Sequence, residues 1–413
     1  MGDKRRTHQA SDGSVNMLLD DVRHLASEIG PRGTGSNGEA AAADYVAGRL
    51  SALGLPIEQQ TFRAVASQNA FPLAIDLLAL LAVVIYPLGG AFTRWLATAL
   101  ALTAAPLLWW TIRSSDSPLR PLLPQVTSRN VLARIEPQGD LHLRCVLLAH
   151  LDTNRCRLAW QSSGVRYTEP LTWLTLVMLA LPGVLYLVGA LLGGPAWPWW
   201  LSLVPAGYIL GTVVTLWRDD LTPFTCGAND NAASVAVVLE TAARLRAQPL
   251  SHTEVWLAFT GAEETDHAGL RALLRQYGTY LRRAAFIDLE GVGGGDLVYL
   301  TRQGLVAHYQ PDADLRALAE SVAAAHPALG VWAAQMTMSD EVSTLRRAGY
   351  RAICIAGRDP ATGTLPHWHR ADDTADTVSA AALERAVSFV LALLKELDHR
   401  PRMGVEEEVC VHS

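Results

Sequence analysis

Residues 143–152 read LRCVLLAHLD, an apolar run that ends in a histidine and an acid. A short, almost uncharged run of this kind is typical of a strand that is buried on both faces. The strand leads directly into His150, and Asp152 follows two residues later. Side chains two residues apart in an extended chain point to the same side. The stretch therefore predicts an imidazole and a carboxylate together at a strand end, which suits a metal ion, although most such tripeptides bind none.

Two other apolar runs also end in acids. The run 254–260 is followed by Glu263 and Glu264, and the run 284–290 closes on Glu290 in front of a glycine-rich loop. A solvated loop or strand end would explain either acid. If the acids are buried, however, their charges are costly without a cation. Both runs therefore add candidate metal ligands. Of the adjacent acids Glu263 and Glu264, one can bind metal while the other stays free to transfer protons.

Two polar segments complete the set of candidates. Asp230 lies among small residues in the segment 227–232, directly before a helix expected over 230–247, where it is either a metal ligand or the N-cap of that helix. His369 lies in the segment 366–374 with an acid, Asp373, four residues later. A carboxylate of this kind commonly orients a metal-bound imidazole. Taken alone, such a run is more often a polar loop.

The order of strands and helices predicts an α/β fold, in which helices sandwich a mostly parallel mixed sheet. Ligands at the carboxyl ends of its strands would meet in the crevice where open α/β sheets bind substrates. Two histidines and three carboxylates are the mixed nitrogen and oxygen ligands that zinc prefers, and a bridging carboxylate is typical of a two-metal site. The remaining expected elements are helices over 16–29, 36–54 and 378–398 and strands over 56–63, 129–135 and 351–356.

Four long segments break this pattern because they are almost free of charge. Only 18% of the 413 residues are charged, against about 25% in a soluble domain. Each segment is near the ~20 residues needed to cross a bilayer. Tryptophans lie near their ends, as in the aromatic belts of membrane proteins. The segments therefore predict four transmembrane helices inserted as two hairpins, with four buried core helices as the alternative: 71–90, 95–112, 171–192 and 197–217.

The order of the segments along the chain constrains the topology. His150 precedes the second hairpin and Asp230 follows it, so an even number of crossings must separate two ligands of one metal centre. Residues 16–66, 119–165 and 219–400 are thus expected to form one discontinuous domain that carries the candidate zinc ligands, with transmembrane hairpin 1 at 69–113 and transmembrane hairpin 2 at 170–217.

The distribution of arginines predicts which side of the membrane this domain occupies. Positive charge concentrates on the cytoplasmic side of multi-pass proteins. Near the membrane, the side with the candidate zinc ligands carries seven arginines against Arg94 alone on the far side: Arg63, Arg113, Arg120, Arg155, Arg157, Arg166 and Arg218. The first fifteen residues are polar and unlike a signal peptide. We therefore expect an integral, multi-pass membrane protein whose ligand-bearing domain lies in the cytoplasm. The net charge of −6 and the absence of a basic stripe indicate no nucleic-acid partner.

The order of these motifs resembles the co-catalytic zinc aminopeptidases. The order is His-x-Asp, Gly-Ala-x-Asp-Asn, Glu-Glu, Leu-Glu, and a histidine with an acid four residues later. That family includes bacterial leucyl aminopeptidases, glutamate carboxypeptidase and the membrane metallopeptidases of the endoplasmic reticulum. The similarity covers residues 22–62, 128–155 and 222–395, and residues 30–36 (GPRGTGS) resemble the family's opening segment.

The resemblance assigns a role to each candidate residue. His150 and Glu290 resemble the ligands of one zinc, Glu264 and His369 those of the second, and Asp230 the carboxylate that bridges them. Further matches concern residues around the metals: Glu263 as general base, Asp152 as the acid that supports His150, and Asp340 and Asp373 as supporting acids behind the ligands. Three positions depart from the common pattern: Glu290 in place of Asp, Glu341 in place of His, and Arg370 in place of Thr.

The resemblance implies a peptidase, and specifically an aminopeptidase, with two Zn²⁺ per chain. Its substrates would be peptides, with membrane-derived peptides among the candidates because the second hairpin leaves the fold near the site. Two alternatives stay open. One is a transferase like glutaminyl cyclase, for which the resemblance implies one zinc. The other is a membrane scaffold that keeps a peptidase fold without its activity.

Overall fold

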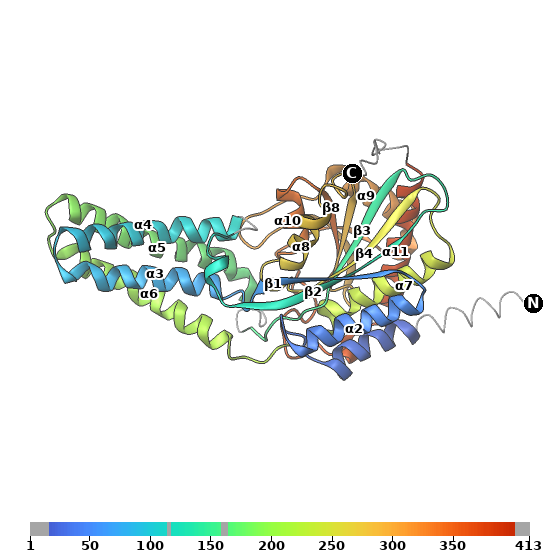
Figure 1. The fold of residues 1–413 in the computed structure, drawn as a ribbon, viewed down its shortest axis with the longest axis horizontal. Coiled ribbons are helices and arrows are strands. Elements are labelled where there is room, and N and C mark those ends of the chain that lie inside the picture. The colour runs from blue at the N-terminus through green and yellow to red at the C-terminus, as the bar shows by residue number, and fades with distance from the viewer. Residues whose placement is uncertain (1–15, 114–116, 158–163, 401–413) are drawn as a thin grey trace, which may run out of the picture.

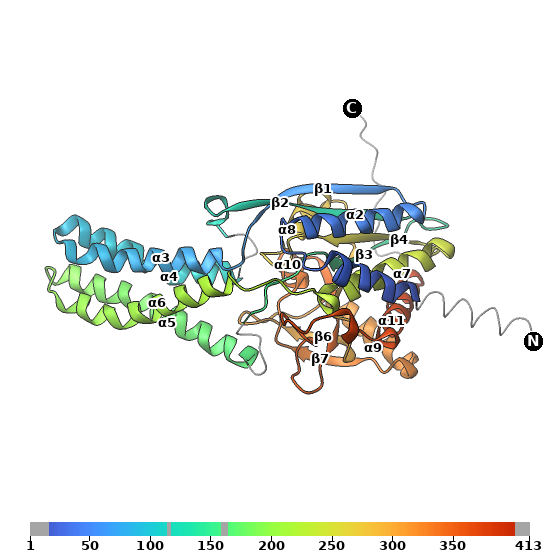
Figure 2. The same ribbon diagram turned by 90° about the horizontal axis from the view of Figure 1, so that it is seen from below.

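The computed structural model describes residues 16–113, 117–157 and 164–400. The molecule is elongated, with a mixed α/β domain at one end and a bundle of four helices projecting from the other (Figures 1 and 2). The predicted α/β fold with four additional apolar helices is confirmed.

An eight-stranded mixed sheet forms the centre of the α/β domain, in the order β1-β2-β4-β3-β5-β8-β6-β7. The middle strands β4, β3, β5 and β8 are parallel, while β1, β2 and β6 each run antiparallel to a neighbour. The strands span Ile57–Val65 (β1), Gln125–Ile135 (β2), Leu143–His150 (β3), Thr253–Thr260 (β4), Ala285–Glu290 (β5), Asp296–Gln303 (β6), Trp332–Met336 (β7) and Arg351–Arg358 (β8).

Helices cover both faces of this sheet. Cys145, Leu147 and Ala149 of β3 belong to one buried cluster, and Val146 and Leu148 to the other. This alternation explains the unbroken apolar run of the strand, because both faces are covered. Helices α2 (Asn37–Ala52), α7 (Ser234–Ala247), α9 (Ala313–Ala325) and α11 (Ala380–Asp398) pack on the first face, and α8 (Ala268–Tyr277) and α10 (Glu341–Arg347) on the second.

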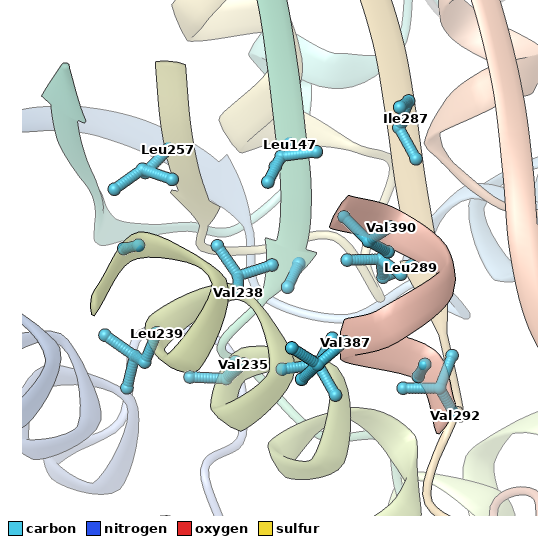
Figure 3. Close-up of a cluster of buried hydrophobic side chains, with 14 of the residues drawn as sticks. Leu147, Val235, Val238, Leu239, Leu257, Ile287, Leu289, Val292, Val387 and Val390 are labelled. Atoms are coloured by element: carbon cyan, nitrogen blue, oxygen red, sulfur yellow. The ribbon is translucent and has the colours of Figure 1, made fainter. Parts of the chain in front are cut away.

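The first of these clusters holds the central strands against α7 and α11. Figure 3 shows Leu147 of β3 and Ile287 of β5 facing Val238 of α7 and Val390 of α11. All four side chains are at most 1% exposed. Burying each side chain of this size stabilises a fold by roughly 1.5–3 kcal/mol. The strands whose ends carry the candidate ligands are therefore held rigidly by this packing.

Four helices form the projecting bundle: α3 (Ala70–Ile85), α4 (Ala91–Arg113), α5 (Thr168–Leu191) and α6 (Trp197–Asp219). All four are long and apolar enough to cross a membrane. Large apolar side chains such as Leu77, Val177 and Val204 are 55%, 57% and 74% exposed on its outside. An apolar surface of this extent suits a lipid environment. The alternative of four buried core helices is therefore wrong.

Several elements were not expected from the sequence. Strands β6 and β7 extend the sheet beyond β8, and the short helices α8 and α10 cover its second face. Strand β7 has only five residues, of which three are exposed, so it lacks a continuous apolar run. Helix α7 begins at Ser234 rather than Asp230, because the backbone at Asp230 and Asn231 departs from helical geometry. Asp230 is therefore not the N-cap of that helix.

Candidate metal centre

Three of the predicted ligands lie at the carboxyl edge of the parallel strands. His150 is the last residue of β3 and Glu290 the last residue of β5. The two strands are adjacent and parallel, and the pairing of Leu148 with Asp288 puts these last residues in the same row. Glu263 and Glu264 follow β4, the neighbour of β3 on its other side. The sheet register thus explains why residues more than a hundred positions apart meet.

The other two ligands, Asp230 and His369, come from loops above this edge. The Asp230 carboxylate lies between the two histidines, with Oδ1 3.2 Å from Nε2 of His150 and Oδ2 3.3 Å from Nε2 of His369. His150 Nε2 is also 3.5 Å from Glu290 Oε2. His369 Nε2 is 3.2 Å from Glu264 Oε1. The five predicted ligands therefore form two groups that share Asp230.

The spacing of these donor atoms fits zinc. Zinc bonds to histidine nitrogen and carboxylate oxygen measure about 2.0–2.2 Å, so two donors of one tetrahedral zinc lie about 3.4 Å apart. The distances of 3.2 and 3.5 Å in one group and 3.2 and 3.3 Å in the other match this value. Each group offers one histidine nitrogen and two carboxylate oxygens, which is the mixed set that zinc accepts.

The charge of the site also points to a cation. His150, Asp230, Glu263, Glu290 and His369 are all at most 7% exposed. Burial raises the pKa of Glu290 to about 7 and the pKa of Glu263 well above its ordinary value. Carboxylates crowded in a buried site are costly when they are charged. Divalent cations would supply the missing positive charge.

Glu263 stands beside the ligands with a different partner. Its Oε1 is 3.2 Å from Nε2 of His267, whose Nδ1 is 2.9 Å from the Thr344 hydroxyl. Burial lowers the pKa of His267 to about 3, so this imidazole is neutral. His267 was not among the residues predicted from the sequence. In the sequence, only its spacing of four residues from Glu263 could have indicated that the two side chains meet.

Asp152 supports the site through the backbone. Its carboxylate accepts hydrogen bonds from the amides of Glu263 and Glu264 at 2.9 and 3.2 Å and from the Thr34 hydroxyl at 2.8 Å. His150 Nδ1 lies closer to the carbonyl oxygen of Asp152, at 3.0 Å, than to its carboxylate, at 3.7 Å. Asp152 thus has two roles. Its carboxylate fixes the backbone at Glu263 and Glu264, and its carbonyl oxygen contacts the His150 imidazole.

The two other supporting acids differ in their distance from the ligands. Asp373 accepts hydrogen bonds from the backbone amides of Asn229 and Asp230 at 2.7 and 3.1 Å, so it fixes the bridging residue. Asp340 lies further away and accepts from Gln303 and Tyr309 at 2.6 and 2.7 Å.

Two more acids crowd the back of the site. Asp288 and Glu341 are buried, and Glu341 accepts a hydrogen bond from the Thr260 hydroxyl at 3.0 Å. Arg370, the third departure from the family pattern, pairs with Asp372 at 2.9 Å.

The opening segment contributes Arg32, which the sequence analysis did not single out. This guanidinium is 1% exposed and donates hydrogen bonds to five carbonyl oxygens, in residues Leu25, Gly30, Leu151, Cys226 and Gly227. It thereby joins the end of β3 to the loop before Asp230. Gly227 is required there, because its φ is +60° and a Cβ would lie 2.2 Å from Thr153 Cγ2.

A chain of polar contacts connects the helix bundle to Glu264. Asn154 donates to Glu264 Oε2 at 2.7 Å and accepts from Arg157 Nε at 2.9 Å. Arg157 in turn donates to Asn69, before α3, at 3.0 Å, and lies 3.6 Å from Asp219 at the end of α6. The ends of both hairpins therefore contact Arg157, which holds the Asn154 side chain that bonds to one of the candidate ligands.

The sequence and the fold both have known relatives. Residues 212–394 match the model of peptidase family M28. Over 180 residues, or 41% of this chain, the sequence is 34% identical to endoplasmic reticulum metallopeptidase 1 of Mus musculus and 33% identical to that of Homo sapiens. The aligned region spans only 19% of the length of these relatives.

Solved structures share the fold at low sequence identity. A zinc aminopeptidase from Bacillus subtilis matches with a TM-score of 0.54 and 15% identity, covering 93% of this chain and 95% of that chain. A glutaminyl cyclase from Bacteroides thetaiotaomicron matches with a TM-score of 0.54 and 17% identity, covering 92% and 97%. These matches confirm the predicted resemblance to the zinc aminopeptidases, and they support a zinc metallopeptidase. Residues 212–394 therefore resemble peptidase family M28, and the chain shares its fold with zinc aminopeptidases and glutaminyl cyclases.

Proposed function

We propose that this protein is a membrane-embedded zinc exopeptidase of the aminopeptidase type. His150 and Glu290 would hold one zinc ion and Glu264 and His369 a second, with Asp230 offering a donor to both. The observation that carries the proposal is that each carboxylate oxygen of Asp230 faces a different histidine, at 3.2 and 3.3 Å. A carboxylate placed in this way has one donor atom for each of two metals.

The proposed reaction is hydrolysis of the first peptide bond of a substrate. Zinc ions bound by these residues would polarise the peptide carbonyl and lower the pKa of the attacking water. Glu263 takes the proton from this water and delivers it to the leaving amine. Neutral His267, 3.2 Å away, orients the Glu263 carboxylate. A zinc ion held here would also bind a free, unprotonated N-terminal amine, which favours removal of the terminal residue over cleavage inside the chain.

The domain organisation belongs to the same proposal. Residues 16–66, 119–165 and 219–400 act as one peptidase domain, with hairpins at 69–113 and 170–217. The domain faces the cytoplasm, as the arginines near this end of the bundle favour. Arg157 is an exception among them, because it is buried beside Asp219. Cleavage at a protease site placed after α11 should occur in inside-out vesicles, and protection there would reverse the orientation.

A glutaminyl cyclase is the second candidate, because members of that class share the fold. The resemblance implies one zinc for a cyclase, whereas His150 and Glu290 offer ligands for a further ion. Three peptides separate the two functions: one with a free leucyl N-terminus, its acetylated form, and one with an N-terminal glutamine. We expect release of leucine from the first peptide only. Cyclisation of the glutaminyl peptide with no release of leucine would replace the proposal with the cyclase.

A further inference from the structure

A large cavity continues from the candidate metal centre into the helix bundle. Its volume is about 880 Å³, near the upper end of the ~300–1,000 Å³ typical of ligand pockets. Glu263, Glu264 and His369 line one end, and residues from all four bundle helices line the other. The catalytic edge of the sheet and the interior of the bundle thus border one space.

The cavity penetrates deep into the part of the bundle that a membrane would surround. Gly207 of α6 lines it, and the helix ends at Asp219 beside the peptidase domain. At a rise of about 1.5 Å per residue, Gly207 lies about 18 Å along the axis from that end. This is more than half of the ~30 Å hydrocarbon core of a bilayer. An extended chain covers the same length with about five residues.

The lining combines apolar walls with a few polar groups. Phe71 and Leu108 are apolar contributors, while Asp76 accepts a hydrogen bond from Thr212 at 2.6 Å and Tyr208 bonds to Thr175 at 2.9 Å. An acyl chain would need only the apolar wall. A peptide also needs hydrogen-bonding partners for its backbone where water is excluded. The mixture therefore favours a peptide with apolar side chains.

Helix α6 leaves space for such a chain. Gly207 and Gly211 lie one turn apart and both line the cavity. A Cβ added at either glycine would meet nothing within 4 Å. A larger side chain at Gly211 would therefore project into open space and occupy it, without displacing a neighbour.

We propose that this cavity binds the apolar segment of a membrane-embedded peptide, whose N-terminal end reaches the metal centre from the bilayer. This inference rests on the proposed function, since it assigns the substrate class of the same site. The first residue lies at the metals, and about five apolar residues behind it occupy the cavity. Short soluble peptides can reach the metals but leave the cavity unfilled.

The test compares substrates that share their first two residues, with the full-length protein in detergent micelles. One is the dipeptide amide, the second continues for six apolar residues, and the third carries an alkyl amide of similar apolar area. We expect kcat/KM of the apolar peptide to exceed that of the dipeptide by at least about tenfold, the effect of burying one apolar side chain. Equal values would overturn the proposal. A value for the alkyl amide above that of the apolar peptide would assign the cavity to an acyl chain instead.

A matched pair of variants locates the effect on α6. Gly211→Phe fills the cavity, whereas Val214→Phe changes a side chain on the same helix that is 46% exposed and does not line it. Gly211→Phe should lower the ratio of the two kcat/KM values, apolar peptide over dipeptide, at least about tenfold. Val214→Phe should leave this ratio unchanged. Equal ratios in the two variants would contradict the assignment of the cavity.

A binding measurement separates this proposal from the peptidase function. Fluorescently labelled apolar peptide is titrated into the full-length Glu263→Gln protein, with and without Gly211→Phe. Weaker binding with Gly211→Phe supports the cavity even if the wild type hydrolyses none of the substrates, a result that would refute only the peptidase. Hydrolysis by the wild type together with identical peptide affinities would refute only the cavity.

Discussion

The carboxyl edge of the sheet and the interior of the helix bundle border the same space but are built differently. At the sheet edge, Asp152 and Asp373 are bonded to the backbone beside the candidate ligands. In the bundle, Thr212 and Thr175 bond to the side chains of Asp76 and Tyr208 on neighbouring helices. The edge is thus fixed before any ligand binds, while the bundle offers a surface of mixed polarity. The chemistry of the site should depend on single atoms at the edge and on shape and apolar area in the bundle.

The largest effect should come from the residue that the two metal groups share. Asp230→Ala removes a donor from both groups and should abolish zinc binding at both positions, and with it all hydrolysis. The comparison requires that the protein still folds, which circular dichroism and gel filtration of the variant would check. A variant that retains two zinc ions would break the claim that Asp230 bridges them.

The second effect isolates chemistry from metal binding. Glu263→Gln keeps a side chain of the same shape but cannot accept the proton. We expect kcat to fall by roughly 10²–10⁴-fold, the usual contribution of a general base. Zinc content, measured by atomic absorption, should stay at the wild-type value. Activity within a few-fold of the wild type would remove Glu263 from this role.

The third effect tests the connection between the two regions. Arg157→Met removes the group that holds Asn154 against Glu264 and joins it to Asn69 and Asp219. Supporting contacts of this kind typically change metal affinity by about 10–100-fold. Competition with a zinc chelator should show this loss for the more weakly held ion. Arg157→Lys keeps the positive charge beside Asp219 and should therefore recover part of the lost zinc affinity.

Arg244→Met provides a control for the loss of an arginine that pairs with acids away from the candidate ligands. Arg244 pairs with Glu240 and Glu384 on the far side of the domain. Its substitution should leave zinc affinity unchanged. Equal losses in Arg157→Met and Arg244→Met would mean that Arg157 acts on general stability rather than on Glu264.

The smallest effect should come from the outside of the bundle. Val177 is 57% exposed on α5 and faces the predicted lipid. Val177→Ala should change the free energy of unfolding by no more than about 0.5 kcal/mol. Leu147→Ala, at 0% exposure in the sheet core, should cost about 2–5 kcal/mol. Thermal denaturation of both variants in detergent would show the contrast, and equal losses would contradict the lipid-facing orientation of α5.

The sequence was most informative at positions where the residue pattern has few explanations other than a metal site or a membrane. The strand that ends in His150 and the paired acids Glu263 and Glu264 could be recognised because charge at the end of a buried strand is costly. The four bundle helices could be recognised because their length and lack of charge match a bilayer. These patterns depend on local sequence alone.

Other features depend on contacts between distant segments and left little local signal. Arg32 looks like an ordinary loop arginine until its five carbonyl partners are seen. Strand β7 is short and largely exposed, so its place in the sheet comes from pairing with β6. The cavity arises where four bundle helices meet the sheet edge, and it continues between them. No single stretch of sequence encodes such a space.

In the proposed site, two zinc ions share the Asp230 carboxylate. The zinc content of the purified full-length wild-type protein, after zinc loading and removal of loosely bound metal, tests this arrangement. We expect two zinc ions per chain. A content of one ion or none, in protein that is folded and monodisperse, would contradict it.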